Sequence, residues 1–181
     1  MSRVKPVTVF NFIKGVIDKT GVACVLIGGF AVNYYKVTRQ TADVDFLITR
    51  EDFDKIAPIL EEKGYKKDLV QTVFARVKDN GMYLMDIDFM FVDRATLEKA
   101  INSGQKIKIA DEEFTVPSLE NLIALKLHSI RYNPDIRRHK DLPDIINLIK
   151  INGIEVREGS FKQLCLKFGT EALYDEILKL C

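Results

Sequence analysis

The sequence predicts an α/β fold in which helices flank a mixed β-sheet, followed by a helical C-terminal part. Short apolar runs suited to buried strands alternate with amphipathic stretches before Pro117. Asp79-Asn80-Gly81 lies between two β-rich runs, a strong signal for an antiparallel hairpin. After Pro117 the apolar residues recur at helical spacing. We therefore expect an α/β core over residues 1–116 and a helical subdomain over residues 117–181 that packs on this core.

The elements of the first part follow from apolar periodicity, helix caps and turn residues. The predicted helices carry apolar side chains three and four positions apart, and the first of them ends at Gly21. The predicted strands are apolar runs or alternate polar with apolar residues. In order, these elements are a helix over 7–20, a strand over 22–27, a short helix from 28, a strand over 44–48, a helix over 49–63, strands over 70–78 and 82–92, a helix over 93–103 and a hairpin over 107–116.

The helical part begins at Ser118, which can cap a helix that carries a stripe of leucine and isoleucine. Pro143 suits the first turn of a further helix, and two shorter helices complete the chain near 161–168 and 171–180. The most basic segment, Arg131–Lys140, is interrupted by Asn133-Pro134. We expect this segment to be a solvated loop, with a patch that contacts RNA or phosphate as the alternative.

The composition argues against several classes of protein. Lys and Arg (27) nearly balance Asp and Glu (26), so no global field attracts the chain to nucleic acid or to an anionic membrane. No stretch has the uninterrupted apolar character of a membrane span or a signal peptide. The three cysteines are far apart, which argues against a disulfide framework and a zinc cluster. We expect a cytoplasmic protein with no membrane partner.

Two pairs of aspartates carry the chemistry that the sequence suggests. Side chains alternate along a strand, so Asp43 and Asp45 lie on one face of their strand. By the same rule, Asp86 and Asp88 lie on one face of a later strand. If the two strands are neighbours, three or four carboxylates converge, which is unfavourable without a cation. Mg²⁺ prefers oxygen ligands and commonly binds carboxylates together with substrate phosphates. The pattern predicts phosphoryl or nucleotidyl transfer, whereas an isolated Asp43-Val-Asp45 would be a solvated strand end.

Glycines and polar residues lie on either side of the first strand and helix. Gly28-Gly29 follows an apolar strand, and the missing side chains would let a phosphate approach the backbone N–H groups. An isolated Gly-Gly pair would be an ordinary turn. Arg39 and Thr41, which precede the aspartates, would position phosphate or the acidic segment, or would form a polar turn.

Together these motifs resemble the signature of the polymerase-beta-like nucleotidyltransferases. The two segments that carry the resemblance are Leu26-Ile-Gly-Gly-Phe-Ala-Val and Arg39-Gln-Thr-Ala-Asp-Val-Asp-Phe-Leu-Ile. The signature consists of a glycine motif, a spacer, two aspartates separated by one residue, and a third acid on a later strand. The Gly-Gly variant is similar to the group that contains type IV toxin–antitoxin nucleotidyltransferases.

The resemblance covers most of the chain, from Gly28 to about Ile149. Its later part lies in Val116-Pro-Ser-Leu-Glu-Asn-Leu-Ile-Ala-Leu-Lys126 and His139-Lys-Asp-Leu-Pro-Asp144, which look like the helical segment of that group. Lys126 would deliver a positive charge to the phosphates, or would extend from an apolar helix face to solvent.

The resemblance also implies roles for the residues of the first part. Gly28 and Gly29 would cradle the triphosphate of a nucleoside triphosphate, and Asp43 and Asp45 would bind Mg²⁺ or Mn²⁺. Asp88 would be the third metal ligand and would help to activate the acceptor hydroxyl. Asp86, on the same strand face, is the alternative for that third position.

The reaction implied is transfer of a nucleoside monophosphate from the triphosphate to a hydroxyl of RNA, protein or a small molecule, with release of pyrophosphate. One alternative is a catalytically silent nucleotide-binding or partner-binding member of a toxin–antitoxin pair, with an antitoxin as partner protein. A plain α/β scaffold is the other. His128 and His139 lack the spacing of a metal pair, so a histidine-based hydrolase is not expected.

Overall fold

The computed structural model describes residues 8–81 and 84–181 and divides the chain into two compact units. The first, which we call the sheet unit, runs to Phe30 and continues over Gln40–Pro117. The second, the helical unit, consists of Ala31–Arg39 and Ser118–Cys181. The helical unit therefore includes a short segment, residues 31–39, that lies far from its other helices in the sequence.

The sheet unit contains most of the predicted elements. Thr8, Thr49 and Asp93 cap three of its helices, each with a side-chain oxygen that accepts the N–H of the residue three positions on. The elements are α1 (Val9–Thr20), β1 (Val25–Ile27), the start of α2 (Gly28–Tyr34), β2 (Asp43–Ile48), α3 (Arg50–Glu62), β3 (Tyr65–Val70), β4 (Phe74–Asp79), β5 (Asp86–Phe91), α4 (Arg94–Asn102), β6 (Gln105–Ile109) and β7 (Glu112–Val116).

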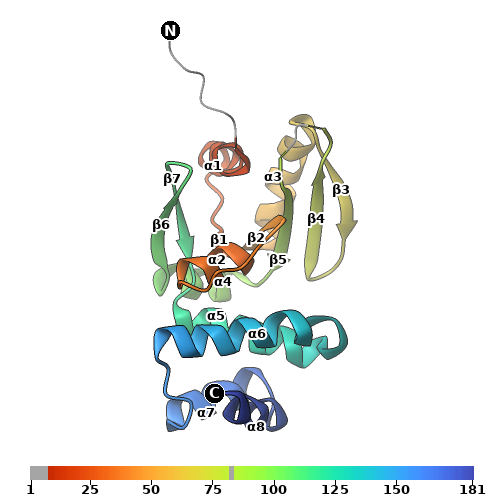
Figure 1. Cartoon of the computed structure of the whole chain (residues 1–181). Helices are drawn as coiled ribbons and strands as arrows, with labels where there is room; N and C mark the ends of the chain where they lie inside the picture. The colour runs from red at the N-terminus through yellow and green to blue at the C-terminus, as the bar shows by residue number, and fades with distance from the viewer. Residues whose placement is uncertain (1–7, 82–83) are drawn as a thin grey trace. The chain divides into compact units, whose positions relative to one another are not determined.

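A five-stranded mixed sheet with the order β1-β2-β5-β4-β3 forms the centre of this unit (Figure 1). β2 and β5 are parallel, and every other neighbouring pair in this sheet is antiparallel. β6 and β7 form a separate hairpin. The predicted α/β class with a mixed sheet and flanking helices is confirmed.

The predicted hairpin around Asp79-Asn80-Gly81 is confirmed in the antiparallel pairing of β4 with β5. Residues 82 and 83, where the second strand was expected to begin, lie outside the described residues. The single strand expected over 70–78 is wrong, because β3 ends at Val70 and β4 begins at Phe74. β3 is an edge strand with exposed lysines, so it lacks the apolar alternation by which strands are recognised.

The apolar core of the sheet unit lies on one face of β2 and β5. Phe46 of β2 and Phe89 of β5 stack there, with ring centroids 6.1 Å apart. Phe53 of α3 packs on Phe89, and Phe114 of β7 packs on Phe46. Because side chains alternate, burial of these rings directs the aspartates of both strands to the opposite face.

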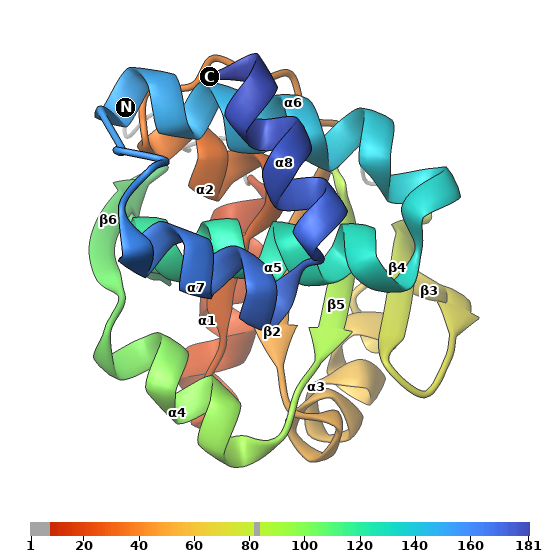
Figure 2. The same cartoon turned by 90° about the horizontal axis from the view of Figure 1, so that it is seen from below.

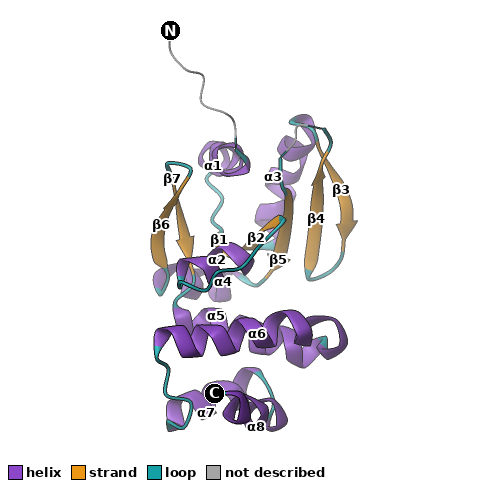
Figure 3. Ribbon diagram, viewed as in Figure 1, coloured by secondary structure: helices purple, strands orange, loops and turns teal. Residues whose placement is uncertain are grey.

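The helical unit consists of helices and loops in its described part (Figures 2 and 3). α5 packs against both α6 and α7, and α7 packs against α8. Ser118 accepts a hydrogen bond from the N–H of Asn121 and so caps α5, as predicted. The helices of this unit are the remainder of α2, α5 (Leu119–Tyr132), α6 (Pro134–Asn152), α7 (Gly159–Phe168) and α8 (Glu171–Leu180).

The expected helix start at Pro143 is wrong, because α6 begins at Pro134 and continues through Pro143. Pro134 takes the first helical position, where a missing N–H has no consequence. Pro143 removes one hydrogen bond in mid-helix, but the buried neighbours Leu142 and Ile145 keep the helix in place by packing. The basic segment 131–140 is therefore mostly helical rather than a loop.

Within the described part of the chain, we find no helix whose length and apolar character would let it cross a membrane.

Replacement of Phe46 by alanine tests the core. Its side chain is fully buried, so we expect the free energy of unfolding to fall by about 3–5 kcal/mol in urea denaturation. Val73, which is 63% exposed, is the control, and Val73→Ala should change stability by less than about 0.5 kcal/mol. Equal stabilities of the two variants would contradict this packing.

Candidate active site

The parallel pairing of β2 with β5 brings three aspartates together. In this register Asp43 lies opposite Asp86, and Asp45 lies opposite Asp88. Carboxylate oxygens of Asp43, Asp45 and Asp88 all lie within 4.8 Å of one another. Asp88 is buried, and the other two are half-buried. The structure therefore places the three predicted metal ligands in one group.

Asp86 has a different environment although it shares a strand face with Asp88. Its Oδ1 accepts a hydrogen bond of 3.0 Å from the backbone N–H of Asp79 on the neighbouring strand. The carboxylate of Asp86 thereby holds the end of β4. Of the two candidates for the third position, Asp88 is the one that joins the group.

Gly28 lies directly beside Asp45, because the pairing of β1 with β2 places Ile27 opposite Asp45. A Cβ atom on Gly28 would lie 1.9 Å from Oδ2 of Asp45. The backbone at Gly28 also has a φ of +62°, which side chains disfavour. A glycine is required here because it makes room for the Asp45 carboxylate.

Gly29 makes room for Thr41 in a similar way. A Cβ atom on Gly29 would lie 2.7 Å from both Cβ and Oγ1 of Thr41. The Thr41 hydroxyl in turn lies 3.0 Å from the carbonyl oxygen and from Oδ1 of Asp43. Thr41 therefore orients Asp43, which is one of its two predicted roles. The binding of phosphate by the glycines stays a prediction.

Arg76 of β4 is a member of this site that the sequence analysis missed. It lies opposite Asp88 in the antiparallel pair, and its Nε and Nη2 atoms donate to the two Asp88 oxygens at 2.7 and 2.6 Å. Its Nη2 lies 4.0 Å from Asp43. The hydrogen bonds to Asp88 raise the pKa of the guanidinium above its ordinary value, so Arg76 stays charged.

The donor set fits a divalent cation. Three carboxylates and one guanidinium give the group a formal charge of −2, and oxygen atoms are the ligands that Mg²⁺ and Mn²⁺ prefer. Cysteine and histidine, the usual ligands of softer metals, are not among the three. Asp43, Asp45 and Asp88 are therefore the residues that could hold such an ion.

Arg39 and Lys126, the two predicted phosphate ligands, belong to the helical unit and contact buried carboxylates there. The ammonium of Lys126 donates to Asp141 and Asp144 at 2.9 and 2.7 Å, and Arg39 lies 2.9 Å from Asp144. Lys126 is only 6% exposed, so it does not extend to solvent. Arg137 also donates to Asp141, and we call these five residues the buried ion network. A phosphate role for Arg39 and Lys126 stays a prediction.

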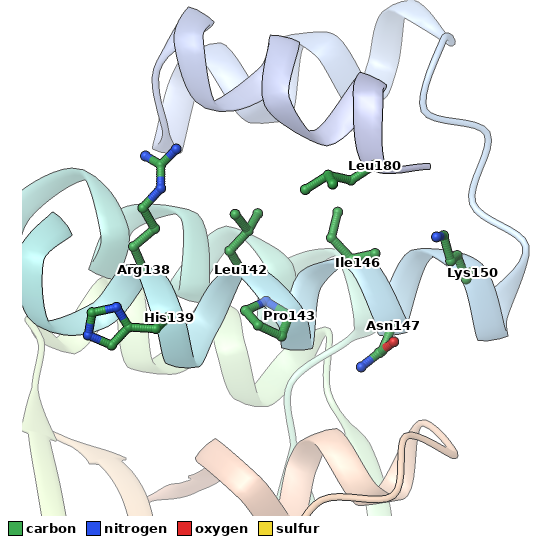
Figure 4. Close-up of a pocket in the computed structure, with 8 residues that line it drawn as sticks. All are labelled: Arg138, His139, Leu142, Pro143, Ile146, Asn147, Lys150 and Leu180. Atoms are coloured by element: carbon green, nitrogen blue, oxygen red, sulfur yellow. The ribbon is translucent and has the colours of Figure 1, made fainter.

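The basic segment 131–140 supplies part of an open groove on the helical unit. Figure 4 shows Leu142 and Ile146 of α6 facing Leu180 of α8, with Arg138 at one end and Lys150 at the other. The groove encloses about 580 Å³. Arg138 forms an ion pair with Glu176, so part of the positive charge is neutralised within the unit. Contact of this segment with RNA or phosphate stays a prediction.

The fold and the acidic group together define a class of protein, the nucleotidyltransferases with a mixed sheet and paired strand aspartates. Over residues 8–174 the chain matches the family described as nucleotidyl transferase of unknown function (DUF2204), and it belongs to that family. This membership confirms the resemblance to polymerase-beta-like nucleotidyltransferases. No curated protein matches the chain at a significant level.

Solved structures of nucleotidyltransferases share the fold at low sequence identity. The antibiotic-resistance factor ANT(2'')-Ia is 17% identical, with a TM-score of 0.64 and 93% of each chain covered. The lincosamide antibiotic adenylyltransferase LnuA is 20% identical, with a TM-score of 0.54, and the match covers 77% of this chain and 94% of LnuA. The Megavirus polyadenylate synthase is 18% identical, with a TM-score of 0.55, and the match covers 81% of this chain but 31% of that enzyme.

Replacement of Gly28 by alanine should disturb Asp45 as well as the backbone. Alanine at positive φ costs roughly 1–3 kcal/mol of stability, and the added Cβ would displace the Asp45 carboxylate. We expect Gly28→Ala to lose Mn²⁺ binding measured by electron paramagnetic resonance.

Gly21→Ala is the matched control for this substitution. Gly21 has a similar φ of +68°, but nothing lies within 4 Å of its added Cβ. It should therefore lose a similar amount of stability and keep the Mn²⁺ affinity of the wild type. Equal Mn²⁺ binding by both variants would contradict the close approach of Gly28 to Asp45.

Replacement of Lys126 by methionine tests the buried ion network. The change leaves Asp141 and Asp144 with one arginine each, so we expect a loss of about 3 kcal/mol, at the lower end for breaking a buried pair. Urea denaturation measures this loss in the free energy of unfolding, and Lys150→Met, on the exposed face of α6, is the control. Unchanged stability together with weaker nucleotide binding would instead favour the phosphate role.

Proposed function

We propose that this chain is a Mg²⁺- or Mn²⁺-dependent nucleotidyltransferase that transfers a nucleoside monophosphate from a nucleoside triphosphate to an acceptor hydroxyl. The observation that carries the proposal is the convergence of Asp43, Asp45 and Asp88 within 4.8 Å, beside a glycine that no side chain could replace. Membership of a nucleotidyl transferase family supports it.

In the proposed reaction the acceptor oxygen attacks the α-phosphorus of the triphosphate. The bond from that phosphorus to the oxygen bridging the α- and β-phosphates breaks, and pyrophosphate leaves with the electron pair. The acceptor gives up its proton to a carboxylate or to water. A bound divalent cation supplies charge stabilisation at the attacking and leaving oxygens.

The residues of the chain have separate tasks in this reaction. Asp43 and Asp45, fixed by Thr41 and by the space that Gly28 leaves, hold the cation. Asp88 is the third ligand of the group and would help to activate the acceptor hydroxyl by taking its proton. Gly28 and Gly29 would offer backbone N–H groups to the triphosphate.

The names of the enzymes of similar fold point to different acceptors, so the fold alone does not identify the acceptor of this chain. The names of ANT(2'')-Ia and LnuA point to antibiotics, and that of the viral enzyme points to polyadenylate. Small hydroxylated compounds and RNA are therefore both acceptors to test, together with protein. An antitoxin partner and a cytoplasmic location stay predictions from the sequence.

Replacement of Asp45 by asparagine tests the proposal. The purified protein is incubated with each α-labelled nucleoside triphosphate, Mg²⁺, and a pool of total RNA, protein and small alcohols. We expect label transfer by the wild type and a loss of more than about 100-fold in Asp45→Asn, beyond the effect of residues that only support a metal ligand. Asp68→Asn, at an exposed ion pair with Lys78, should keep full activity.

Thermal unfolding separates the alternatives. In saturating Mn²⁺, nucleotide at 100 times its dissociation constant should stabilise the wild type by about 2.7 kcal/mol beyond Mn²⁺ alone, but should not stabilise Asp45→Asn. Stabilisation without label transfer under any condition would favour the catalytically silent nucleotide-binding protein. A wild type that neither is stabilised nor transfers label would end the proposal.

A further inference from the structure

The guanidinium of Arg76 contacts Asp88, the buried acid of the site. Both of its hydrogen bonds end on Asp88, one on each carboxylate oxygen, at 2.7 and 2.6 Å. A carboxylate offers about four lone-pair positions, and this two-pronged contact uses two of them. A cation that binds Asp88 must therefore share its oxygens with Arg76 or displace it.

Arg76 also performs the electrostatic task that a cation would perform. The three carboxylates within 4.8 Å repel one another, and Arg76 contacts one of them and approaches Asp43 to 4.0 Å. A guanidinium and a divalent cation repel each other when they bind the same oxygens. The guanidinium and a divalent cation therefore exclude each other from Asp88.

The positions of the two side chains determine which one can move. Asp88 is fixed in the sheet with 7% of its side chain exposed, whereas 37% of the Arg76 side chain is exposed. The Arg76 guanidinium also lies 5.8 Å from the ring centre of Phe74, which is two residues earlier on the same face of β4. Arg76 has a flexible stem and open space towards solvent, so it can leave Asp88 without any movement of the sheet.

We propose that Arg76 is the resident counter-ion of the acidic group, which holds Asp88 until a divalent cation and triphosphate bind and then transfers its contact from Asp88 to the triphosphate. The inference rests on the proposed function and adds a residue to it. The planar fork of arginine fits phosphate oxygens as well as it fits a carboxylate, so the displaced guanidinium gains an equivalent partner when the triphosphate enters.

This exchange couples the two ligands. The cation alone must displace Arg76 without compensation and therefore binds weakly. The cation with a triphosphate binds more tightly, because the triphosphate receives the guanidinium. Arg76 is a positioning residue towards Asp88 and a binding residue towards the triphosphate.

The test is a titration of the full chain with Mn²⁺ in the absence of nucleotide, followed by electron paramagnetic resonance. Arg76→Ala should bind Mn²⁺ more tightly than the wild type, by about 5-fold or more, which is the usual lower range of coupling between sites. Arg76→Lys keeps the charge but loses the fork, and should show a smaller gain. Arg50→Ala removes an arginine from an exposed ion pair with Asp54 and should bind Mn²⁺ as the wild type does.

The second measurement uses inorganic tripolyphosphate with saturating Mn²⁺, followed by calorimetry. Here the order should reverse: Arg76→Ala should bind the tripolyphosphate more weakly than the wild type, by about 5-fold or more, and Arg76→Lys by less. Arg50→Ala should again match the wild type. A change in the fold alone would weaken both ligands, whereas the proposal requires opposite changes.

The outcomes separate this inference from the proposed function. If the wild type binds Mn²⁺ and both Arg76 variants bind it with unchanged or lower affinity, the counter-ion role is overturned and the metal site stands. If the folded wild type and Arg76→Lys both fail to bind Mn²⁺ even in the presence of tripolyphosphate, the metal site is overturned, and the counter-ion role with it. Arg76→Lys retains the positive charge and decides the question if Arg76→Ala does not fold.

Discussion

The parallel pairing of β2 with β5 is the constraint on which the site depends. The first four residues of each strand alternate between acidic and apolar side chains, and the packing of Phe46 on Phe89, and of Phe89 on Phe53 of α3, fixes which face is buried. The acids of both strands then lie on the other face. A register shift of one residue would expose the phenylalanines and remove Asp45 and Asp88 from each other, so the hydrophobic core and the acidic group are consequences of the same alignment.

Concentrating three carboxylates has an electrostatic cost, and the neighbouring residues show how the fold limits it. Thr41 orients one acid through its hydroxyl, Gly28 leaves space for another, and Arg76 neutralises the third. The buried ion network of the helical unit follows a different rule. There Asp141 and Asp144 are buried, and each forms ion pairs with two cationic side chains. Of these two clusters, the acidic group is the one with an excess of formal negative charge, which is the property that a metal site requires.

Many elements were predictable because their signals are local. The caps at Thr49 and Ser118, the turn before β5 and the glycine after β1 each depend on residues within a few positions. The errors also have local causes. β3 is an exposed edge strand with little apolar alternation, and Pro143 lies inside a helix that buried neighbours hold together. Local propensity cannot include such long-range packing.

By itself, the sequence determined the fold class, the family and the pairing of acids on each strand, because alternation along a strand and short motifs are properties of consecutive residues. Tertiary structure alone decided that Asp88 joins Asp43 and Asp45 while Asp86 binds a backbone N–H. It also placed Arg76 on Asp88. These outcomes depend on strand order and register, which are set by the packing of residues far apart in the chain and cannot be read from the spacing of neighbours.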